Sequence, residues 1–392
     1  MMTSRDRTSG GSFEAAADAV VSGDAVALQA MVASSPGLPV ARSPRDHGAM
    51  LIHYVAANGV EDERQRTPPN AVDIAETLIK GGAEMNATFL DGASGTTPLV
   101  SLVTSIHPHR AGVASDLVEA FVAAGAKVNG LNDDGEPLRL ALEFGFLESA
   151  EALVRCGAEV STIAQAAGLG RIDLVTASLE GGGLPRTDVD AAFALACRYG
   201  WTAVAEVLLD EGVDIDAQGP SGFTGLMWAV RFGRLDTIKL LLDRGASMDI
   251  TNDYGGTAFG VGMHFLQHAP EPGVDYAATI DALFSAGHRP PRGVAATGQM
   301  MVDAVLATHG FLRQGPAPTA HAMFAAIWRR EADSVRAMLN DRPDLVDAWL
   351  TGNSWSEFAG MEVWDSRGYE APRGLDPLAY ATVLGAAECV RC

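Results

Sequence analysis

The sequence has few cysteines and few basic residues for its length. Four cysteines in 392 residues are too few for the disulfide framework of a small secreted domain, and they suit a reducing compartment. Lysine and arginine number 28 against 49 aspartate and glutamate residues, which gives a formal net charge of −21. Because this charge repels phosphate backbones and anionic lipid surfaces, we expect binding neither to nucleic acid nor to membranes.

Long hydrophobic runs are also missing. No stretch approaches the roughly 18 consecutive apolar residues that cross a membrane, and the N-terminal sequence MMTSRDRTSGGS lacks the apolar segment of a signal peptide. These absences favour a cytoplasmic protein, and the frequent alanine, glycine and arginine suggest a GC-rich bacterial genome. Hydrophobic residues still make up 47% of the chain, which is ample for a core.

One segment of the sequence returns after a short interval. Residues 212–216 (GVDID) are echoed by residues 245–249 (GASMD), 33 positions later. A repeat at this period predicts stacked units, because a single helix pair cannot bury its apolar face alone. Gly233 and Gly245 each follow a predicted helix, at the position where a left-handed backbone ends the helix.

The stretch 213–249 resembles an ankyrin repeat. The family pattern runs D-x-x-G-x-T-P-L-H-x-A-A-x-x-G, followed by a longer helix that ends in L-L-L-x-x-G-A. Gly225 and Met227 replace the proline and the histidine of that pattern. The matching residues are Gly222, Thr224, Leu226, Ala229, Gly233, Leu240, Leu241, Leu242, Gly245 and Ala246. We expect Leu226, Leu240 and Leu241 to fill the layer between units.

The resemblance implies an all-α fold, an ankyrin-repeat solenoid of stacked helix-turn-helix units with loop or hairpin fingers. Residues 1–12 are polar and are expected to be disordered. The array and its N-terminal cap cover residues 13–289, and an irregular Pro/Gly-rich junction with a helix around 300–308 covers residues 290–319. Residues 320–392 are expected to form a second, incomplete ankyrin-like sub-stack with an aromatic-rich loop at 351–373.

Two early units carry the clearest motif residues and also carry insertions. Residues 51–57 (LIHYVAA) match the family's L-H-x-A-A and place His53 in the capping position, while Thr97, Pro98 and Leu99 give a complete T-P-L. Residues 61–69 and 106–110 interrupt these units. Both insertions fall between the two helices of a unit, where repeat proteins tolerate extra residues.

The resemblance implies a protein-protein interaction scaffold, because ankyrin arrays bind partners through their loop tips and the concave face of their inner helices. Two tryptophans of the aromatic-rich loop are either binding anchors or residues packed down to bury the loop. The partner-contacting candidates carried over from the family positions, together with these tryptophans, are Asn132, Asp133, Glu143, Phe144, Pro220, Ser221, Phe223, Arg231, Phe232, Asp253, Tyr254, His264, Phe265, Trp355 and Trp364.

Two other functions remain open at this stage. One is a small-molecule-binding protein or enzyme with a pocket near the 351–373 loop, although the chain has no nucleophile elbow and no phosphate loop. The other is weak self-association of a monomer through the C-terminal edge at residues 386–392. The partner itself is an unidentified protein.

Three spacings of metal-ligating side chains occur, and each has an ordinary explanation in helix surface or core. We predict no metal, no cofactor and no catalytic residue, because none of these pairs has a third ligand nearby in the sequence. The pairs are His107 with His109, His264 with His268, and Cys389 with Cys392.

Overall fold

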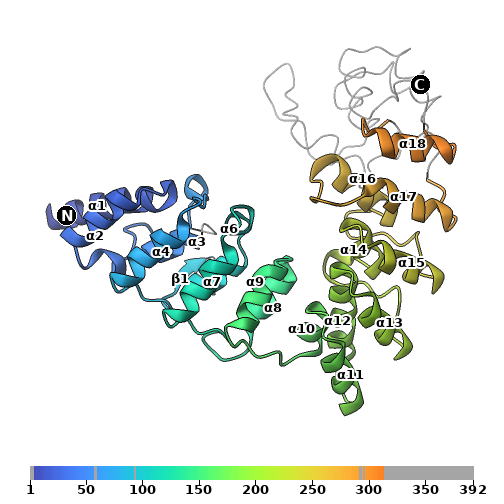
Figure 1. Cartoon of the computed structure of the whole chain (residues 1–392), viewed down its shortest axis with the longest axis horizontal. Helices are drawn as coiled ribbons and strands as arrows, with labels where there is room; N and C mark the ends of the chain where they lie inside the picture. The colour runs from blue at the N-terminus through green and yellow to red at the C-terminus, as the bar shows by residue number, and fades with distance from the viewer. Residues whose placement is uncertain (1–3, 57–59, 92–93, 291–293, 295, 313–392) are drawn as a thin grey trace, which may run out of the picture. The chain divides into compact units, whose positions relative to one another are not determined.

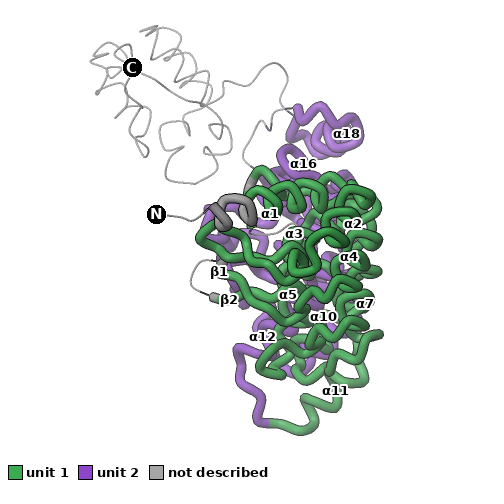
Figure 2. The backbone as a smooth tube through the Cα atoms, turned by 90° about the vertical axis from the view of Figure 1, so that its left-hand side faces the viewer, with its two compact units in different colours: residues 1–182 green, residues 183–392 purple. Residues whose placement is uncertain are grey.

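A computed structural model describes residues 4–56, 60–91, 94–290, 294 and 296–312. The predicted sub-stack at 320–392, including Trp355 and Trp364, lies outside these residues. The contacts within the chain divide it into two compact units, unit 1 (residues 1–182) and unit 2 (residues 183–392), coloured separately in Figure 2. The repeat pattern does not predict this division.

Unit 1 is a stack of helix pairs (Figure 1). The first helices of successive pairs pack on one another in the order α1, α3, α5, α8 and α10, and the second helices pack in the order α2, α4, α7 and α9. Two layers result. The helices are α1 (Ser4–Ser22), α2 (Ala25–Ser34), α3 (Leu51–Ala56), α4 (Ala71–Lys80), α5 (Pro98–Val103), α6 (Ile106–Arg110), α7 (Ala114–Ala123), α8 (Glu136–Phe144), α9 (Leu147–Arg155), α10 (Ile163–Gly168) and α11 (Ile172–Gly181).

Short elements fill the connections of unit 1. The 3₁₀ helices η1 (Leu38–Val40) and η2 (Asp62–Arg64) lie between the longer helices, and η2 and α6 occupy the two predicted insertions. Strands β1 (Phe89–Asp91) and β2 (Ser94–Thr96) form an antiparallel hairpin finger, in which Phe89 pairs with Thr96.

Unit 2 repeats the same two-layer arrangement. Its inner helices pack in the order α12, α14 and α16, its outer helices in the order α13, α15 and α17, and α18 packs on α17. The elements are α12 (Arg186–Tyr199), α13 (Thr202–Asp210), η3 (Pro220–Gly222), α14 (Gly225–Arg231), α15 (Leu235–Asp243), α16 (Ala258–His268), α17 (Tyr276–Ser285) and α18 (Met300–Thr308). The prediction of an all-α solenoid is confirmed, and none of the described helices has the length and hydrophobicity to cross a membrane.

Threonine side chains begin the inner helices, as the motif predicts. The hydroxyl of Thr97 accepts a hydrogen bond from the Val100 amide, that of Thr224 from Met227, and that of Thr257 from Gly260, each at 3.3 Å. Such a cap satisfies an amide that the first turn of the helix leaves unpaired.

Apolar side chains fill the layers between successive repeats within a unit. Leu226, Ala229 and Leu241 are buried as expected, whereas Leu240 is only half-buried. Gly233 has a φ of +62° and Gly245 a φ of +87°, which confirms the predicted left-handed positions.

Helix α1 begins nine residues earlier than the sequence predicts. Residues 4–12 were expected to be disordered, but they continue the helix. Extending an existing helix avoids the cost of nucleating a new one. The polar residues at the start of α1 can therefore join the helix that the apolar residues after them form.

Gly225 replaces the family's proline because α14 approaches α12 closely. A Cβ atom at this position would lie 2.9 Å from the Cys197 Sγ atom and 2.9 Å from the Phe193 Cε1 atom. Gly260, in the first turn of α16, faces open space apart from the Thr257 hydroxyl at 3.7 Å. The two glycines share a place near a capping threonine but differ in the room around them.

We predict opposite effects for one change made at these two positions. Gly225→Ala lowers the free energy of unfolding by about 1–3 kcal/mol, because the new methyl group overpacks the α12–α14 contact. Gly260→Ala raises it by about 0.5–1 kcal/mol, because alanine has less conformational entropy to lose in a helix. Urea denaturation followed by circular dichroism measures both, and the same sign for both variants contradicts the packing argument.

Candidate functional site

The predicted loop-tip residues of unit 2 lie side by side at the surface. Pro220 and Ser221 are exposed in η3, and Asp253 and Tyr254 are exposed in the next loop, with Tyr254 67% accessible. The Asp253 amide donates a hydrogen bond to the Ser221 carbonyl oxygen at 3.0 Å. This bond joins two successive tips into one surface.

The predicted candidates of unit 1 belong to one repeat. Asn132 and Asp133 are exposed in the loop before α8, and Glu143 and Phe144 are exposed at its end. Glu143 is ion-paired with Arg139 at 2.9 Å. Phe144 is 53% accessible, a large exposed fraction for an aromatic side chain.

Phe223 does not lie at the surface, contrary to its selection as a contact residue. It is only 7% accessible, and its ring centroid lies 4.6 Å from that of Trp228. An apolar ring in a finger folds back onto the nearest inner helix because burial removes it from water. We therefore remove Phe223 from the surface that is open to a partner.

Unit 2 brings Arg231, Phe232 and Phe265 together with residues that were not predicted. We call this group the arginine–aromatic cluster, and its members are Arg198, Trp228, Arg231, Phe232, Arg234 and Phe265. The Arg231 guanidinium carbon lies 4.1 Å from the Phe265 ring centroid and 4.9 Å from that of Phe232. These distances are typical of cation–π contacts.

The other two guanidinium groups extend the cluster along the inner helices. The Arg198 guanidinium carbon lies 4.8 Å from the Trp228 centroid and 5.1 Å from the Phe232 centroid. The Arg234 Nε atom donates a hydrogen bond to the Arg198 carbonyl oxygen at 3.1 Å. Burial lowers the pKa of Arg198 and of Arg234, but an arginine side chain stays charged in a protein.

One carboxylate approaches the cluster from the connection between α16 and α17. The Arg231 Nη2 atom lies 3.3 Å from the Glu271 Oε1 atom, and their side chains are 25% and 30% accessible. The Arg231 Nε atom is buried without a hydrogen-bond partner among the described residues.

A positional signal in the sequence identifies Arg198, one of the cluster residues that were not predicted. Arg198-Tyr199, Arg231-Phe232 and His264-Phe265 recur every 33 residues. The first two pairs fall at the end of an inner helix, and the third lies within the second half of α16. In unit 1 the corresponding pair is Glu143-Phe144. A positive charge near a helix C-terminus is favourable, which is why this position accepts arginine.

Comparison with known proteins agrees with this architecture. A family model described as "Ankyrin repeats (3 copies)" matches residues 163–252. A human protein named "Ankyrin repeat and SOCS box protein 16" is 30% identical over 232 residues, which cover 53% of this chain and 49% of that protein. The chain contains ankyrin repeats.

A second kind of relative matches a shorter region. The horse (Equus caballus) "Ankyrin repeat, SAM and basic leucine zipper domain-containing protein 1" is 36% identical over 70 residues, which cover 18% of this chain and 15% of that protein. The sheep (Ovis aries) protein of the same name is 32% identical over 85 residues, 22% of this chain and 18% of that protein. The chain thus spans about half or less of the length of these curated relatives.

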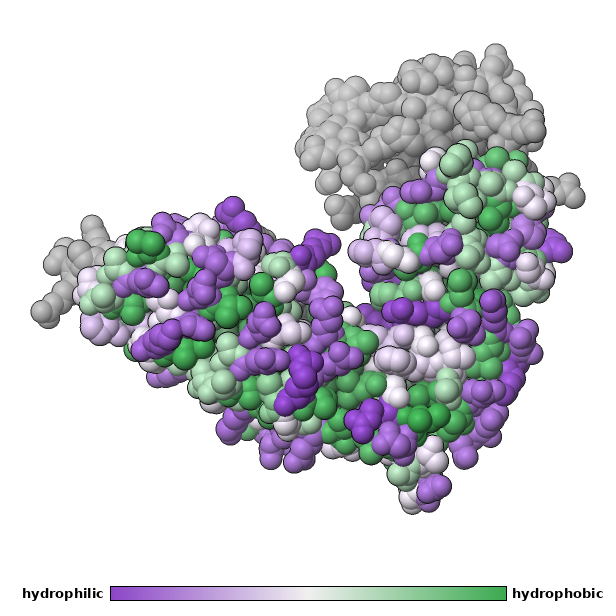
Figure 3. Space-filling model, viewed as in Figure 1, coloured by the Kyte–Doolittle hydropathy of each residue, from purple (hydrophilic) through white to green (hydrophobic). Residues whose placement is uncertain are grey.

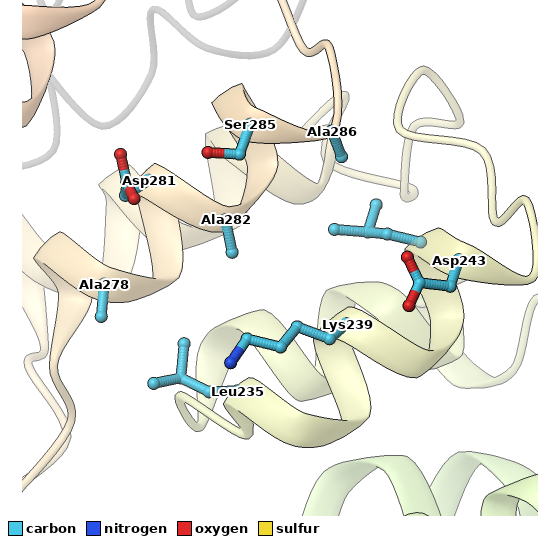
Figure 4. A pocket seen from close by; sticks show the side chains of 9 residues that line it. Leu235, Lys239, Asp243, Ala278, Asp281, Ala282, Ser285 and Ala286 are labelled. Atoms are coloured by element: carbon cyan, nitrogen blue, oxygen red, sulfur yellow. The ribbon is translucent and has the colours of Figure 1, made fainter.

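A groove lies between the outer helices α15 and α17 of unit 2. Its volume is about 430 Å³, and Figure 4 shows the extended Lys239 side chain lying along it toward Leu235. Asp243, Asp281 and Ser285 also line it, but no histidine or cysteine does.

His264 and His268 stack with their ring centroids 4.8 Å apart on α16. Burial, followed by the positive charges of His268 and Arg231, lowers the pKa of His264. The described residues contain no group of three histidine, cysteine or carboxylate side chains that could hold a metal ion.

A dense ionic network fixes the first insertion of unit 1. The buried Glu61 carboxylate accepts hydrogen bonds from Tyr54 and Arg64 and lies 3.1 Å from an Arg45 nitrogen. Arg64 also pairs with Glu14 at 2.7 Å and with Asp18 at 2.8 Å. Because every buried charge here has an opposite partner, the network is a structural clamp of η2 onto α1.

His53 has the capping role that the resemblance implies. Its Nδ1 atom accepts a hydrogen bond from the Met50 amide at 3.1 Å, and its Nε2 atom lies 3.1 Å from the Ala87 carbonyl oxygen. An acceptor at Nδ1 and a donor at Nε2 require the neutral imidazole. Burial accordingly lowers the pKa of His53 to about 4.

The lowered pKa of His53 predicts a loss of stability in mild acid. The unfolded chain binds a proton on His53 below about pH 6.5, whereas the folded chain binds it only near pH 4, so stability falls as the pH decreases through this window. Between pH 7 and pH 5 the loss attributable to His53 is about 2 kcal/mol.

Urea denaturation of the wild type and of His53→Gln at both pH values measures this contribution. The variant is less stable at pH 7 but has the flatter pH dependence. The other histidines are present in both proteins, so the difference between the two slopes isolates His53. Parallel slopes contradict the assignment.

Proposed function

We propose that this protein binds a protein partner through the loop tips and the concave inner-helix face of its ankyrin repeats. Ankyrin repeats are generally protein-protein interaction modules, and the family is typically a non-enzymatic scaffold. The observation that carries the proposal is the joined tip surface of unit 2, where Ser221 and Asp253 are linked and Tyr254 is exposed.

The tip surface has the properties of a binding anchor. Tyrosine provides a large amphipathic contact area with only two rotatable side-chain bonds, so fixing it on binding costs little entropy. The Tyr254 amide donates a hydrogen bond to the Asn252 Oδ1 atom at 3.0 Å, and the Gly256 amide donates to the same atom at 2.9 Å. The loop that presents Tyr254 is therefore already ordered, which lowers the cost of binding.

Hydrophilic and hydrophobic side chains are interspersed over the face of unit 2 that Figure 3 shows. Non-obligate interfaces have this mixed character, with a few aromatic anchors among polar side chains. The small number of cysteines supports a cytoplasmic setting for the complex.

The test is affinity capture from a lysate of the native host. The tip variant carries Asp253→Ala and Tyr254→Ala, and a control variant carries Asp236→Ala and Lys239→Ala, two exposed positions of α15 on the outer layer. We expect wild type and control to retain a protein that the tip variant loses. With the purified partner, the tip variant should bind at least about tenfold more weakly, as the removal of an aromatic anchor typically does.

Equal thermal stability of the three proteins is the necessary control, because all four positions are on the surface. Capture of the same proteins by the wild type and the tip variant would show that the joined tips do not form the binding surface.

A further inference from the structure

The arginine–aromatic cluster of unit 2 is unlike the network around Arg45 and Arg64 in unit 1. In unit 1, Arg45 and Arg64 are paired with four carboxylates, those of Glu14, Asp18, Glu61 and Glu63. In unit 2, Glu271 is the one described carboxylate that forms an ion pair with Arg231 or Arg234. The same chain therefore contains a saturated arginine network and an unsaturated one.

The unsaturated site is open to a ligand. A quarter of the Arg231 side chain is accessible, and Glu271 is the one described carboxylate that forms an ion pair with it. Phe232 and Phe265, on which its guanidinium rests, are both partly exposed. A guanidinium held on aromatic faces has a fixed orientation, so little entropy is lost when an anion pairs with it.

We propose that this cluster binds an acidic segment of the protein partner, with an aspartate or glutamate carboxylate pairing with Arg231 and a neighbouring side chain packing on Phe232 and Phe265. This inference rests on the proposed function and specifies the chemistry of the partner. Carboxylate and guanidinium match in geometry, and their hydrogen bonds are stronger than those between neutral groups.

Glu271 shows that a carboxylate can reach the site from the surface. The amide of Glu271 donates a hydrogen bond to the Tyr276 hydroxyl at 3.1 Å, which holds the segment in place while its carboxylate lies beside Arg231. This side chain resembles the ligand that we propose and occupies one side of the guanidinium. It therefore competes with an incoming carboxylate.

The charge of the whole chain favours a peptide over a nucleic acid as the anionic partner. A formal charge of −21 repels an extended phosphate backbone at every point of contact. A short acidic segment needs only the local positive field of Arg231 and Arg234, together with Arg198 behind them. Complementary charge of this kind confers specificity and accelerates encounter.

The test measures the binding of a fluorescein-labelled oligoglutamate peptide to the whole chain by fluorescence anisotropy. An oligoglutamine peptide of the same length and a single-stranded oligonucleotide serve as comparison probes. We expect the protein to bind oligoglutamate more tightly than either, and to lose affinity as salt is raised.

Three variants make the test specific to the cluster. Arg231→Gln is expected to weaken oligoglutamate binding by at least about tenfold. Glu271→Gln is expected to strengthen it severalfold, because the competing carboxylate is removed, and misfolding does not produce a gain of affinity. Arg139→Gln removes a surface arginine that is also paired with a glutamate, and it is expected to leave binding unchanged.

The inference is overturned if oligoglutamate does not bind, if Arg231→Gln binds it as wild type does, or if Glu271→Gln weakens binding. Tighter binding of the oligonucleotide, or equal binding of oligoglutamine, overturns it as well. A partner that is captured through the loop tips while oligoglutamate fails to bind leaves the proposed function standing and removes only the acidic chemistry. Oligoglutamate binding with the expected response of all three variants supports the inference whether or not the lysate contains a captured partner.

Discussion

No helix pair of this chain can bury its own apolar face, and the rest of the structure depends on that constraint. Leu226 and Ala229 of α14 are buried only because α12 and α16 pack on either side of it. Burying such side chains stabilises each contact by about 25 cal/mol for every Å² removed from water. The stability of a repeat array therefore comes from the contacts between neighbouring repeats as well as from each repeat itself.

This constraint divides the positions of a repeat into those where the residue type is restricted by packing and those where it can vary. Residues between the layers must fit a neighbour, and Gly225 shows how tightly, since even a methyl group meets Cys197 and Phe193. Residues at the loop tips and at the ends of the inner helices face outward. A period of 33 places equivalent residues of successive repeats in register, so residues far apart in sequence, such as the buried Arg198 and the partly exposed Arg231, contact the same aromatic rings.

Features that depend on local sequence were predictable. Capping threonines, left-handed glycines and the buried His53 follow from residues within a single unit, because a turn or a cap is determined by a few neighbours. Because these motif residues recur every 33 positions, they also predict the fold class. Features that require two neighbouring repeats were missed. Arg198 of α12 and Trp228 of α14 form part of one site only because these two helices pack together.

Two other differences arise within a single repeat or helix. Phe223 sits in a finger and looks exposed by its position in the motif, but Trp228 on the next inner helix offers it a larger buried contact. The helical start at Ser4 depends on continuation from the apolar part of α1 rather than on residues 4–12 themselves. In both cases the neighbouring residues were in view in the sequence, but the motif gives a position along the chain and not the contact that the side chain or the helix end makes.

The contrast between the two arginine sites separates structural from functional use of charge in one chain. Burying a guanidinium costs stability unless opposite charges and hydrogen bonds compensate for lost hydration. Around Arg64 the compensation is complete, with Glu14, Asp18 and Glu61 all within 2.8 Å. Around Arg231, aromatic faces supply part of it, about 0.5–2 kcal/mol for a cation–π contact, and Glu271 supplies the rest on one side only.

If the cluster served only to stabilise the fold, one more acidic residue beside Arg231 would compensate its charge more fully. The chain has 49 acidic residues and places four of them around Arg45 and Arg64 of unit 1. Under the proposal above, a carboxylate from outside the chain pairs with the exposed part of the Arg231 guanidinium, which Glu271 contacts on one side only. The stability forgone at Arg231 is then recovered when the partner binds, because the incoming carboxylate completes the pairing that the fold leaves open.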